Sequence, residues 1–229
     1  MMELNSDFSQ RVVVHSDRLQ WQASPMKGVE RRMLDRIGDE VARATTIVRY
    51  APKSNFSRHI HGGGEELLVL DGVFQDEHGD YPAGSYLRNP PQSSHTPRSD
   101  LGCTIFVKLR QFDLGDRQSV RISPEDLSAT ADSQRPGVEI VPLFKDRREE
   151  VRLEIWQPNI EVKIAAPAGA ELLVLAGSFK VGRDKLGLNS WLRVPINSEI
   201  NAIVGDRGAK IWLKTGHLAF AIPTETITR

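Results

Sequence analysis

Residues 59–74 read His-Ile-His-Gly-Gly-Gly-Glu-Glu-Leu-Leu-Val-Leu-Asp-Gly-Val-Phe, and this stretch decides the fold that we expect. Its apolar part returns 105 residues downstream, where residues 171–179 read Glu-Leu-Leu-Val-Leu-Ala-Gly-Ser-Phe. Self-similarity at a fixed spacing is typical of a duplicated unit. The chain has 229 residues, so each copy has about 110 residues, enough to bury a core. We therefore expect a domain at 1–115, a linker at 116–137 and a second domain at 138–229.

The rest of the sequence extends the repeat and indicates an all-β fold. Residues 85–90 correspond to 190–195, and residues 100–108 correspond to 206–214 with one insertion. Short apolar or β-branched runs, separated by Gly, Pro, Asn and Asp, predict strands of a sandwich or barrel. These runs are 11–14, 45–50, 67–70, 103–109, 151–156, 172–175 and 210–213.

Two charged stretches are harder to interpret. Residues 28–41 predict a strand followed by a turn, with a short helix as the alternative. Residues 113–137 are rich in Asp, Ser, Arg and Pro, as expected of a linker. Within them, Ser123 followed by Pro124 predicts the start of one short helix.

Three histidines and one glutamate form a candidate metal site. Alternate residues of a strand share a face, so His59 and His61 project together, and the glycines that follow permit a tight turn before Glu65. The rigid turn containing Pro90 and Pro91 could bring His95 to the same place. Neutral imidazole suits Fe, Ni, Cu and Zn, and a carboxylate adds one anionic oxygen. Four such ligands make a closed structural site for tetrahedral Zn, or leave positions open on a metal that takes five or six ligands.

The second copy of the repeat supports this grouping, because every candidate ligand changes there while the flanking residues persist. Side chains that are all replaced by apolar residues in the second copy are expected to form one coordinating unit in the first. The residues at the positions of His59, His61, Glu65 and His95 are Ile164, Ala166, Ala170 and Ile200.

These motifs resemble those of the cupin superfamily. His59-x-His61-x3-Glu65-x6-Gly72 is similar to the first cupin motif. Gly84-x5-Pro90-x4-His95 is similar to the second, with Gln92 where glycine is usual and Ser99 where asparagine is usual. Residues 45–112 resemble, more narrowly, the cupin domain of ChrR-type anti-sigma factors and small dioxygenases of the acetylacetone-cleaving type.

The resemblance implies a bicupin, in which two jelly-roll (double-stranded β-helix) barrels follow one another and only the first binds metal. It assigns His59, His61, Glu65 and His95 as ligands of one divalent metal, which could be Zn, Fe, Ni or Mn. It also implies a non-haem dioxygenase acting on a small diketone or hydroxyketone, with Leu67, Val69, Ile105 and Val107 lining the barrel. The alternatives are a stress or ligand sensor and a protein that Zn merely stiffens. No acid–base pair stands out, so no catalytic residue is assigned.

Partners and location follow from simpler features. Lys+Arg and Asp+Glu number 30 each, which provides no basic field for nucleic acid or acidic lipid. ChrR-type proteins that bind sigma factors carry a helical zinc domain with clustered His and Cys, which is not found here, so a sigma factor is not an expected partner. A small-molecule ligand is expected, and monomer and homodimer are both open. No signal peptide or run of 18 apolar residues is present, so we expect a cytoplasmic protein.

Other polar residues have simpler interpretations. Cys103 is the one cysteine, so an intrachain disulfide is excluded. We expect its side chain in the core, with a redox role as the alternative. His78 is expected in a solvated loop, and His15 and His217 in structural or surface positions. Glu66 persists as Glu171 in the second copy, which favours a role in the fold over ligation.

Overall fold

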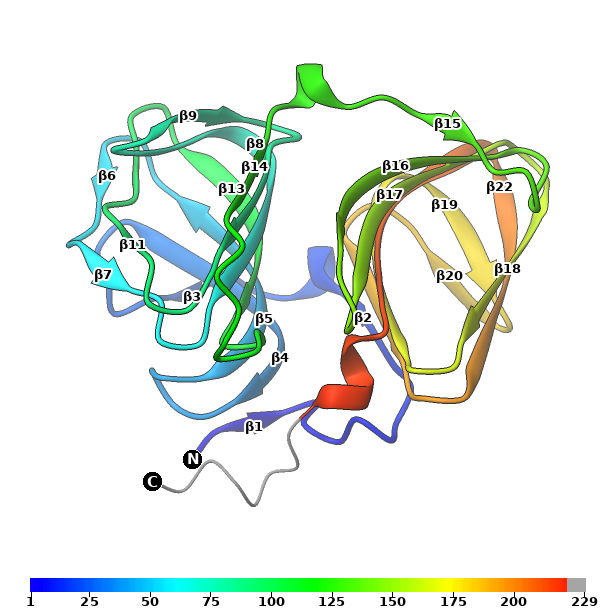
Figure 1. Cartoon of the computed structure of the whole chain (residues 1–229), viewed down its shortest axis with the longest axis horizontal. Helices are drawn as coiled ribbons and strands as arrows, with labels where there is room; N and C mark the ends of the chain where they lie inside the picture. Colours follow the sequence, from blue (N-terminus) through cyan, green and yellow to red (C-terminus); the bar gives the residue numbers. More distant parts are fainter. Residues whose placement is uncertain (222–229) are drawn as a thin grey trace. The chain divides into compact units, whose positions relative to one another are not determined.

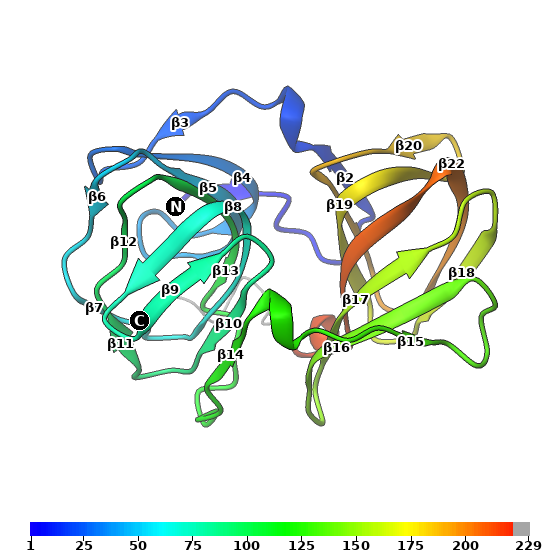
Figure 2. The same cartoon turned by 90° about the horizontal axis from the view of Figure 1, so that it is seen from above.

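The computed structural model describes residues 1–221, which form two compact units (Figure 1). Unit 1 comprises Met1–Ser6 and Gln20–Leu127, and unit 2 comprises Asp7–Leu19 and the chain from Ser128 onward. In both views the strands of each unit curl around a core (Figures 1 and 2). The described residues hold strands and short 3-10 helices, so the all-β expectation is confirmed.

Unit 1 is built on an antiparallel sheet in the order β1-β4-β5-β13-β8-β10-β14, with β3 beside β4, β9 beside β8, and β12 pairing β6 and β8. A separate pair, β7 and β11, carries His59 and His95. The strands are β1 (Glu3–Leu4), β3 (Gln22–Ala23), β4 (Val29–Ile37), β5 (Arg43–Tyr50), β6 (Ser54–Asn55), β7 (His59–Ile60), β8 (Glu65–Asp76), β9 (Gly79–Pro82), β10 (Tyr86–Asn89), β11 (Ser94–His95), β12 (Arg98–Ser99), β13 (Cys103–Leu109) and β14 (Val120–Ile122).

Unit 2 has a sheet in the order β15-β16-β17-β22-β19-β21-β2, with β18 beside β22 and β20 beside β19. Its strands are β2 (Val12–His15), β15 (Thr130–Ala131), β16 (Val138–Lys145), β17 (Glu150–Trp156), β18 (Glu161–Ala166), β19 (Ala170–Val181), β20 (Asp184–Leu186), β21 (Ser190–Val194) and β22 (Ser198–Thr215). The 3-10 helices of the described residues are η1 (Ser16–Arg18), η2 (Pro124–Asp126) and η3 (His217–Phe220). None of them is long and apolar enough to span a bilayer.

The duplication predicted from the sequence is visible strand by strand. β8 and β19 have 12 residues each, and each pairs with the strand that holds the next conserved part of the repeat, β13 or β22. Both pairings contain a bulge near a glycine with positive φ, at Gly72 (+70°) and Gly177 (+67°). A β-carbon on Gly72 would collide with the carbonyl oxygen of Gly102, and one on Gly177 with that of Gly208. The shared Gly of the repeat therefore lets two strands approach closely at the bulge.

The cores differ in one respect that matters for the site. In unit 2 the buried cluster includes Ile164, Ala166, Ala170 and Ile200, so the positions of the four candidate ligands are packed with apolar side chains. In unit 1 the buried apolar cluster includes Leu67, Val69, Phe74 and Ile105 but none of the four candidate ligands. Unit 1 thus keeps an apolar core but has polar groups at the four positions that unit 2 fills with apolar side chains.

The contact-defined units differ from the expected boundaries 1–115, 116–137 and 138–229 at two places. Residues 12–15 form an edge strand of unit 2, where Val13 pairs with Leu192, because a Val-Val-Val run fits the unpaired edge of β21. Residues 120–122 of the expected linker pair with β10 of unit 1. The expected short helix is the 3-10 turn η2, and residues 28–41 form a strand and a turn, as predicted.

Candidate metal centre

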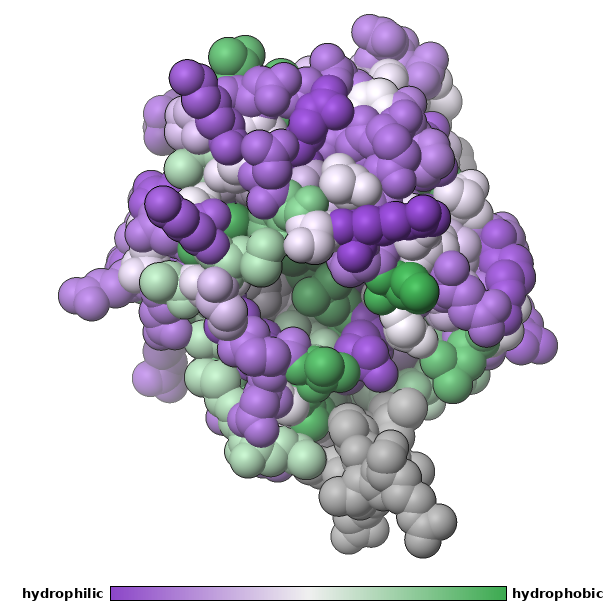
Figure 3. Space-filling view, turned by 90° about the vertical axis from the view of Figure 1, so that its left-hand side faces the viewer, coloured by the Kyte–Doolittle hydropathy of each residue, from purple (hydrophilic) through white to green (hydrophobic). Residues whose placement is uncertain are grey.

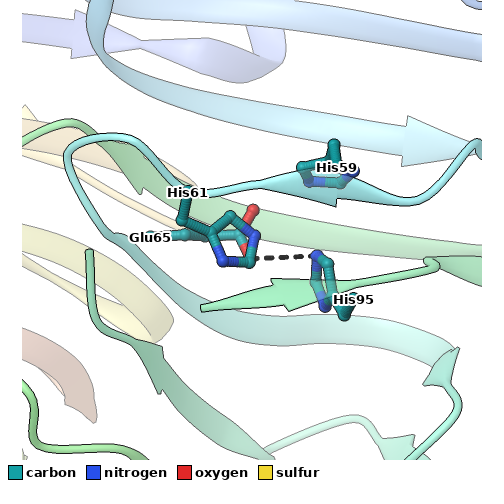
Figure 4. A group of neighbouring side chains, drawn as sticks. All are labelled: His59, His61, Glu65 and His95. Atoms are coloured by element: carbon teal, nitrogen blue, oxygen red, sulfur yellow. Dashed lines mark ion pairs between the residues drawn. The ribbon is translucent and has the colours of Figure 1, made fainter. Parts of the chain in front are cut away.

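The strands β7 and β11 place the histidines side by side. They pair antiparallel with His59 directly opposite His95, and the pairing continues where the amide of His61 donates to the Ser93 carbonyl over 2.9 Å. The turn after Pro90 thus returns the chain onto the His-x-His segment. Figure 4 shows His59 on β7, His95 on β11 and His61 just after β7, gathered beside Glu65.

The three glycines bring Glu65 into the same cluster. The amide of Arg110 donates to the Gly64 carbonyl over 2.9 Å, and the amide of Phe112 donates to the Gly63 carbonyl over 3.2 Å. A β-carbon on Gly63 would lie 2.8 Å from the Arg110 α-carbon, and one on Gly64 would collide with the Phe112 ring. Only glycine therefore lets the loop lie against residues 110–112 while β8 begins at Glu65.

The ligand atoms of the four residues all lie within 4.8 Å of one another. Glu65 Oε2 lies 3.3 Å from His61 Nε2 and 3.4 Å from His95 Nε2. The ring centroid of His59 lies 5.1 Å from that of His61 and 4.9 Å from that of His95. Three imidazoles and one carboxylate thus face a single point.

Hydrogen bonds at the opposite ring nitrogens fix which atoms face inward. The Ser93 hydroxyl donates to the Pro90 carbonyl over 2.6 Å, so its oxygen accepts from His61 Nδ1 over 2.9 Å. His95 Nδ1 donates to Asp76 Oδ2 over 3.2 Å. Because Nδ1 carries the proton in both rings, each Nε2 presents a lone pair to the cluster.

The hydrogen bonding of the inward-facing Nε2 atoms shows whether the cluster fits a metal. In residues 1–221, Nε2 of His61 and Nε2 of His95 are buried and accept no hydrogen bond. A buried polar atom without a partner is costly, and a cation among these lone pairs would satisfy both rings together with Glu65. The donor set of three nitrogens and one carboxylate oxygen suits a transition metal. The residues present therefore fit a metal ion.

Burial and charge move the pKa values of the two buried imidazoles in opposite directions. Burial, only partly opposed by the charge of Glu65, lowers the pKa of His61, so this ring is neutral and ready to ligate at neutral pH. Burial also acts to lower the pKa of His95, but the hydrogen bond to Asp76 and the charges of Glu65 and Asp76 outweigh it and raise the pKa. A metal must therefore displace a proton more often from His95 than from His61 as the pH falls.

A cavity of about 450 Å³ adjoins the cluster. Its walls include Val29, Val48, Tyr50 and the predicted residues Ile105 and Val107, and His59, His61 and Glu65 face it. Leu67 and Val69, also predicted to line the barrel, lie instead in the buried cluster beside Ile105. Figure 3 shows a hollow on the face of unit 1, with hydrophobic residues at its base and mostly hydrophilic residues around it. The cavity has the size and lining of a small-molecule site.

Sequence reasoning missed the residues that orient the ligands. Asp76 pairs with His95 and is held by the backbone amide of His78 (2.7 Å), and Asn89 Nδ2 donates to Glu65 Oε2 over 3.0 Å. Both could have been found in the repeat, since their counterparts in unit 2 are Val181 and Val194. Each polar group is replaced by an apolar one exactly where the ligands are also lost.

The remaining polar residues have structural roles. His217 Nε2 lies 2.9 Å from Glu171 Oε1, both buried, and His15 Nδ1 lies 3.0 Å from the Ser190 hydroxyl. His78 is exposed, as predicted. Glu66 is buried and accepts a hydrogen bond from the Tyr86 hydroxyl over 2.6 Å, which agrees with a role in the fold.

Asp76→Asn is expected to lower metal affinity by about 10- to 100-fold, the usual cost of losing a partner that orients a ligand. The amide still fits the space but no longer carries the charge that favours Nδ1–H of His95. Competition with a chromogenic chelator measures the affinity. Asp80→Asn serves as control, because the Asp80 side chain is 64% exposed and lies outside the cluster. Equal affinities of D76N and the parent would contradict the role given to Asp76.

Gln92, at the usual glycine position, has φ +74°, which explains why glycine is favoured there. The side chain is exposed, so Gln92→Gly should remove strain without loss of packing. We expect the free energy of unfolding, measured with urea, to rise by about 0.5–1 kcal/mol. This is the cost of a left-handed conformation for a residue with a β-carbon, less the larger entropy that glycine loses on folding. Gln92→Ala, which keeps the strain, should leave stability within about 0.5 kcal/mol of the parent.

Cys103 is buried, and burial raises the pKa of its thiol from 9.0 to about 11. At pH 8 this rise lowers the thiolate fraction by about 100-fold, and the thiolate is the reactive form. We therefore expect native protein to react with iodoacetamide at least about 100-fold more slowly than urea-unfolded protein. Mass spectrometry of timed samples measures both rates, and rapid native alkylation would favour the redox alternative.

Comparisons with known proteins agree with this geometry. The model of the ChrR cupin-like domain family matches residues 9–113. A candidate dioxygenase from Nostoc punctiforme superposes with a TM-score of 0.76 at 16% identity, over 92% of this chain and 84% of that one. No protein of curated function matches the sequence significantly.

Two further solved structures share the fold. The bacterial pirin of Escherichia coli, solved with nickel(II), has a TM-score of 0.63 at 14% identity and covers 90% of this chain and 98% of its own. Oxalate decarboxylase of Lactobacillus farciminis, solved with formate, has a TM-score of 0.62 at 11% identity and covers 94% of this chain and 89% of its own. At these identities the likeness concerns the fold.

The described residues form two barrels with the cupin fold, with a cluster of three histidines and one glutamate in the first barrel and an apolar core at the same positions of the second. Its N-terminal half resembles, more particularly, the cupin domain of ChrR-type proteins, over the residues that the family model matches.

Proposed function

We propose that this bicupin is a metal-dependent dioxygenase that acts on a small diketone or hydroxyketone. The observation that carries the proposal is that His61 Nε2, His95 Nε2 and Glu65 converge beside a cavity of about 450 Å³. A non-haem metal held there would bind substrate oxygens and O2 and exchange electrons with them. The likeness to a candidate dioxygenase supports this class of reaction.

The chain's own residues would bind and shield the substrate. Four protein ligands leave one or two positions open on a metal that takes five or six, which suits a substrate with two neighbouring oxygens. Ile105 and Val107 give the cavity apolar walls that exclude water and accept short alkyl groups.

The test begins with the metal. Purified protein is analysed by plasma emission, and O2 uptake is followed with 2,4-pentanedione and with a 2-hydroxyketone as probes. Stoichiometric Fe, Ni or Mn with O2 uptake supports the proposal. Protein loaded separately with each of these metals that takes up no O2 with either probe contradicts it.

The alternative function is a stress or ligand sensor, favoured by the match of residues 9–113 to the ChrR cupin-like domain. A sensor would bind metal and a small molecule without turnover and would recover a specific protein partner from cell extract. Tightly bound Zn, no O2 uptake and such a partner would together favour the sensor over the dioxygenase.

A further inference from the structure

Arg110 lies immediately after β13 and lines the same cavity as His59, His61 and Glu65. Its guanidinium runs beside the glycine loop, since a β-carbon on Gly62 would lie 3.0 Å from Arg110 Nη1. Gly62 directly follows the ligand His61. The side chain of Arg110 is therefore positioned next to the metal cluster, at the wall of the cavity.

Other arginines of the cavity are already occupied, whereas Arg110 is not. Arg31 pairs with Glu40 over 3.1 Å, and Arg36 donates to the Gly38 carbonyl over 3.1 Å. Within residues 1–221, the Arg110 side chain has no ion pair or hydrogen bond and is exposed. Its five N–H donors remain available to a ligand.

Arg110 has a left-handed backbone conformation that favours glycine, and the second copy of the repeat has glycine at this position. Arg110 has φ +58°, and its counterpart in unit 2 is Gly216, with φ +91°. The two residues occupy the same corner, since the amide of Gly216 donates to the Gly169 carbonyl (3.2 Å) as the amide of Arg110 does to Gly64. Glycine adopts this conformation freely, whereas a residue with a β-carbon is disfavoured there.

Arginine in a strained corner beside a cluster of ligands indicates a role in the site, because such strain persists where function requires it. The comparison of the units strengthens this inference. Unit 2, where Ile164 and Ile200 replace two of the histidines, also has glycine in place of the arginine. The cation is thus present in the unit that has the ligand set and absent from the unit that has lost it.

We infer that Arg110 anchors a carboxylate of the substrate, so that the substrate is a small dicarbonyl compound bearing a carboxylate, an oxo acid. The inference rests on the proposed function and narrows its substrate class. A guanidinium binds a carboxylate through two parallel hydrogen bonds. Without this cation, the part of the cavity beside the cluster would present the negative charge of Glu65 to an anionic substrate, with no free guanidinium beside it.

The test compares a carboxylate-bearing probe with a neutral one. Metal-loaded protein is titrated calorimetrically without O2, using 2,4-dioxopentanoate and 2,4-pentanedione. We expect the dioxo acid to bind about 10- to 100-fold more tightly, the range for a paired, charge-assisted hydrogen bond. Arg110→Ala should remove this preference, so that the two probes bind with similar affinity. Arg98→Ala, at an arginine outside the cavity lining, should change neither affinity.

A second variant separates the ligand role from the backbone. Arg110→Gly should lose the same preference as Arg110→Ala, but its melting temperature should exceed that of Arg110→Ala because glycine relieves the positive φ. A lower melting temperature of the glycine variant would contradict the strain argument.

The inference is overturned if the parent binds both probes equally, if neither binds, or if R110A retains the preference. Inorganic phosphate that competes as strongly as the dioxo acid would also overturn the choice of a carboxylate. The result is distinguishable from failure of the proposed function. Preferential binding without O2 uptake would contradict the dioxygenase while supporting the anchor.

Discussion

Replacing both His59 and His61 with alanine is expected to abolish stoichiometric metal binding. The double variant removes two of four donors that lie within 4.8 Å of one another. Loss of a partner that merely orients a ligand costs about 10- to 100-fold in affinity, so loss of two ligands should exceed about 100-fold. Plasma emission after dialysis measures the bound metal, and chelator competition measures the affinity.

Thermal unfolding gives a second readout of the same change. A metal present at 100 times its dissociation constant stabilises the folded parent by about 2.7 kcal/mol, which should raise its melting temperature by several degrees. The double variant should show no such rise. His78→Ala is the matched control, because His78 is an exposed histidine of the same unit. Retention of a full complement of metal by the double variant would refute the ligand assignment.

The clustering of the four candidate ligands could be predicted because its information is local and repeated. His59 and His61 share a strand face, and the motif gives the spacing to Glu65. The copy in unit 2 then shows which positions change together. The strand β13 was predicted with its observed bounds, because Cys103–Leu109 is mostly apolar or β-branched and directly follows a glycine. By contrast, β22 extends over Ser198–Thr215, far beyond the predicted 210–213. In the first half of this strand buried residues alternate with exposed ones, so it contains no continuous apolar run.

The contact between Asp76 and His95 and the sheet position of residues 12–15 depend on pairing between distant segments, which residue patterns alone do not specify. Asp76 meets His95 only because both strands reach the same end of the barrel. The run at 12–14 is visibly β-prone, but its pairing with β21 of unit 2 depends on which sheet edge is free. The positive φ of Arg110 became visible only when its backbone was seen beside Gly64.

Gly72→Ala is expected to be among the most destabilising single substitutions in the fold. Its φ of +70° costs a residue with a β-carbon about 1–2 kcal/mol. The added methyl would also collide with the Gly102 carbonyl and lie 2.9 Å from the Cys103 α-carbon, both backbone of the paired strand segment. Backbone atoms in a sheet cannot move aside without breaking hydrogen bonds. The total loss should therefore exceed about 3 kcal/mol, a large part of the usual 5–15 kcal/mol.

The two contributions can be separated with a glycine that has the same backbone conformation but open surroundings. Gly182 has φ +61°, and a β-carbon there would meet nothing within 4 Å. Gly182→Ala should cost only the conformational part, about 1 kcal/mol. Gly177→Ala, which meets the Gly208 carbonyl in unit 2, should match Gly72→Ala. Urea unfolding measures all three, and equal losses for G72A and G182A would show that conformation alone, rather than the close approach of two strands, requires glycine in the repeat.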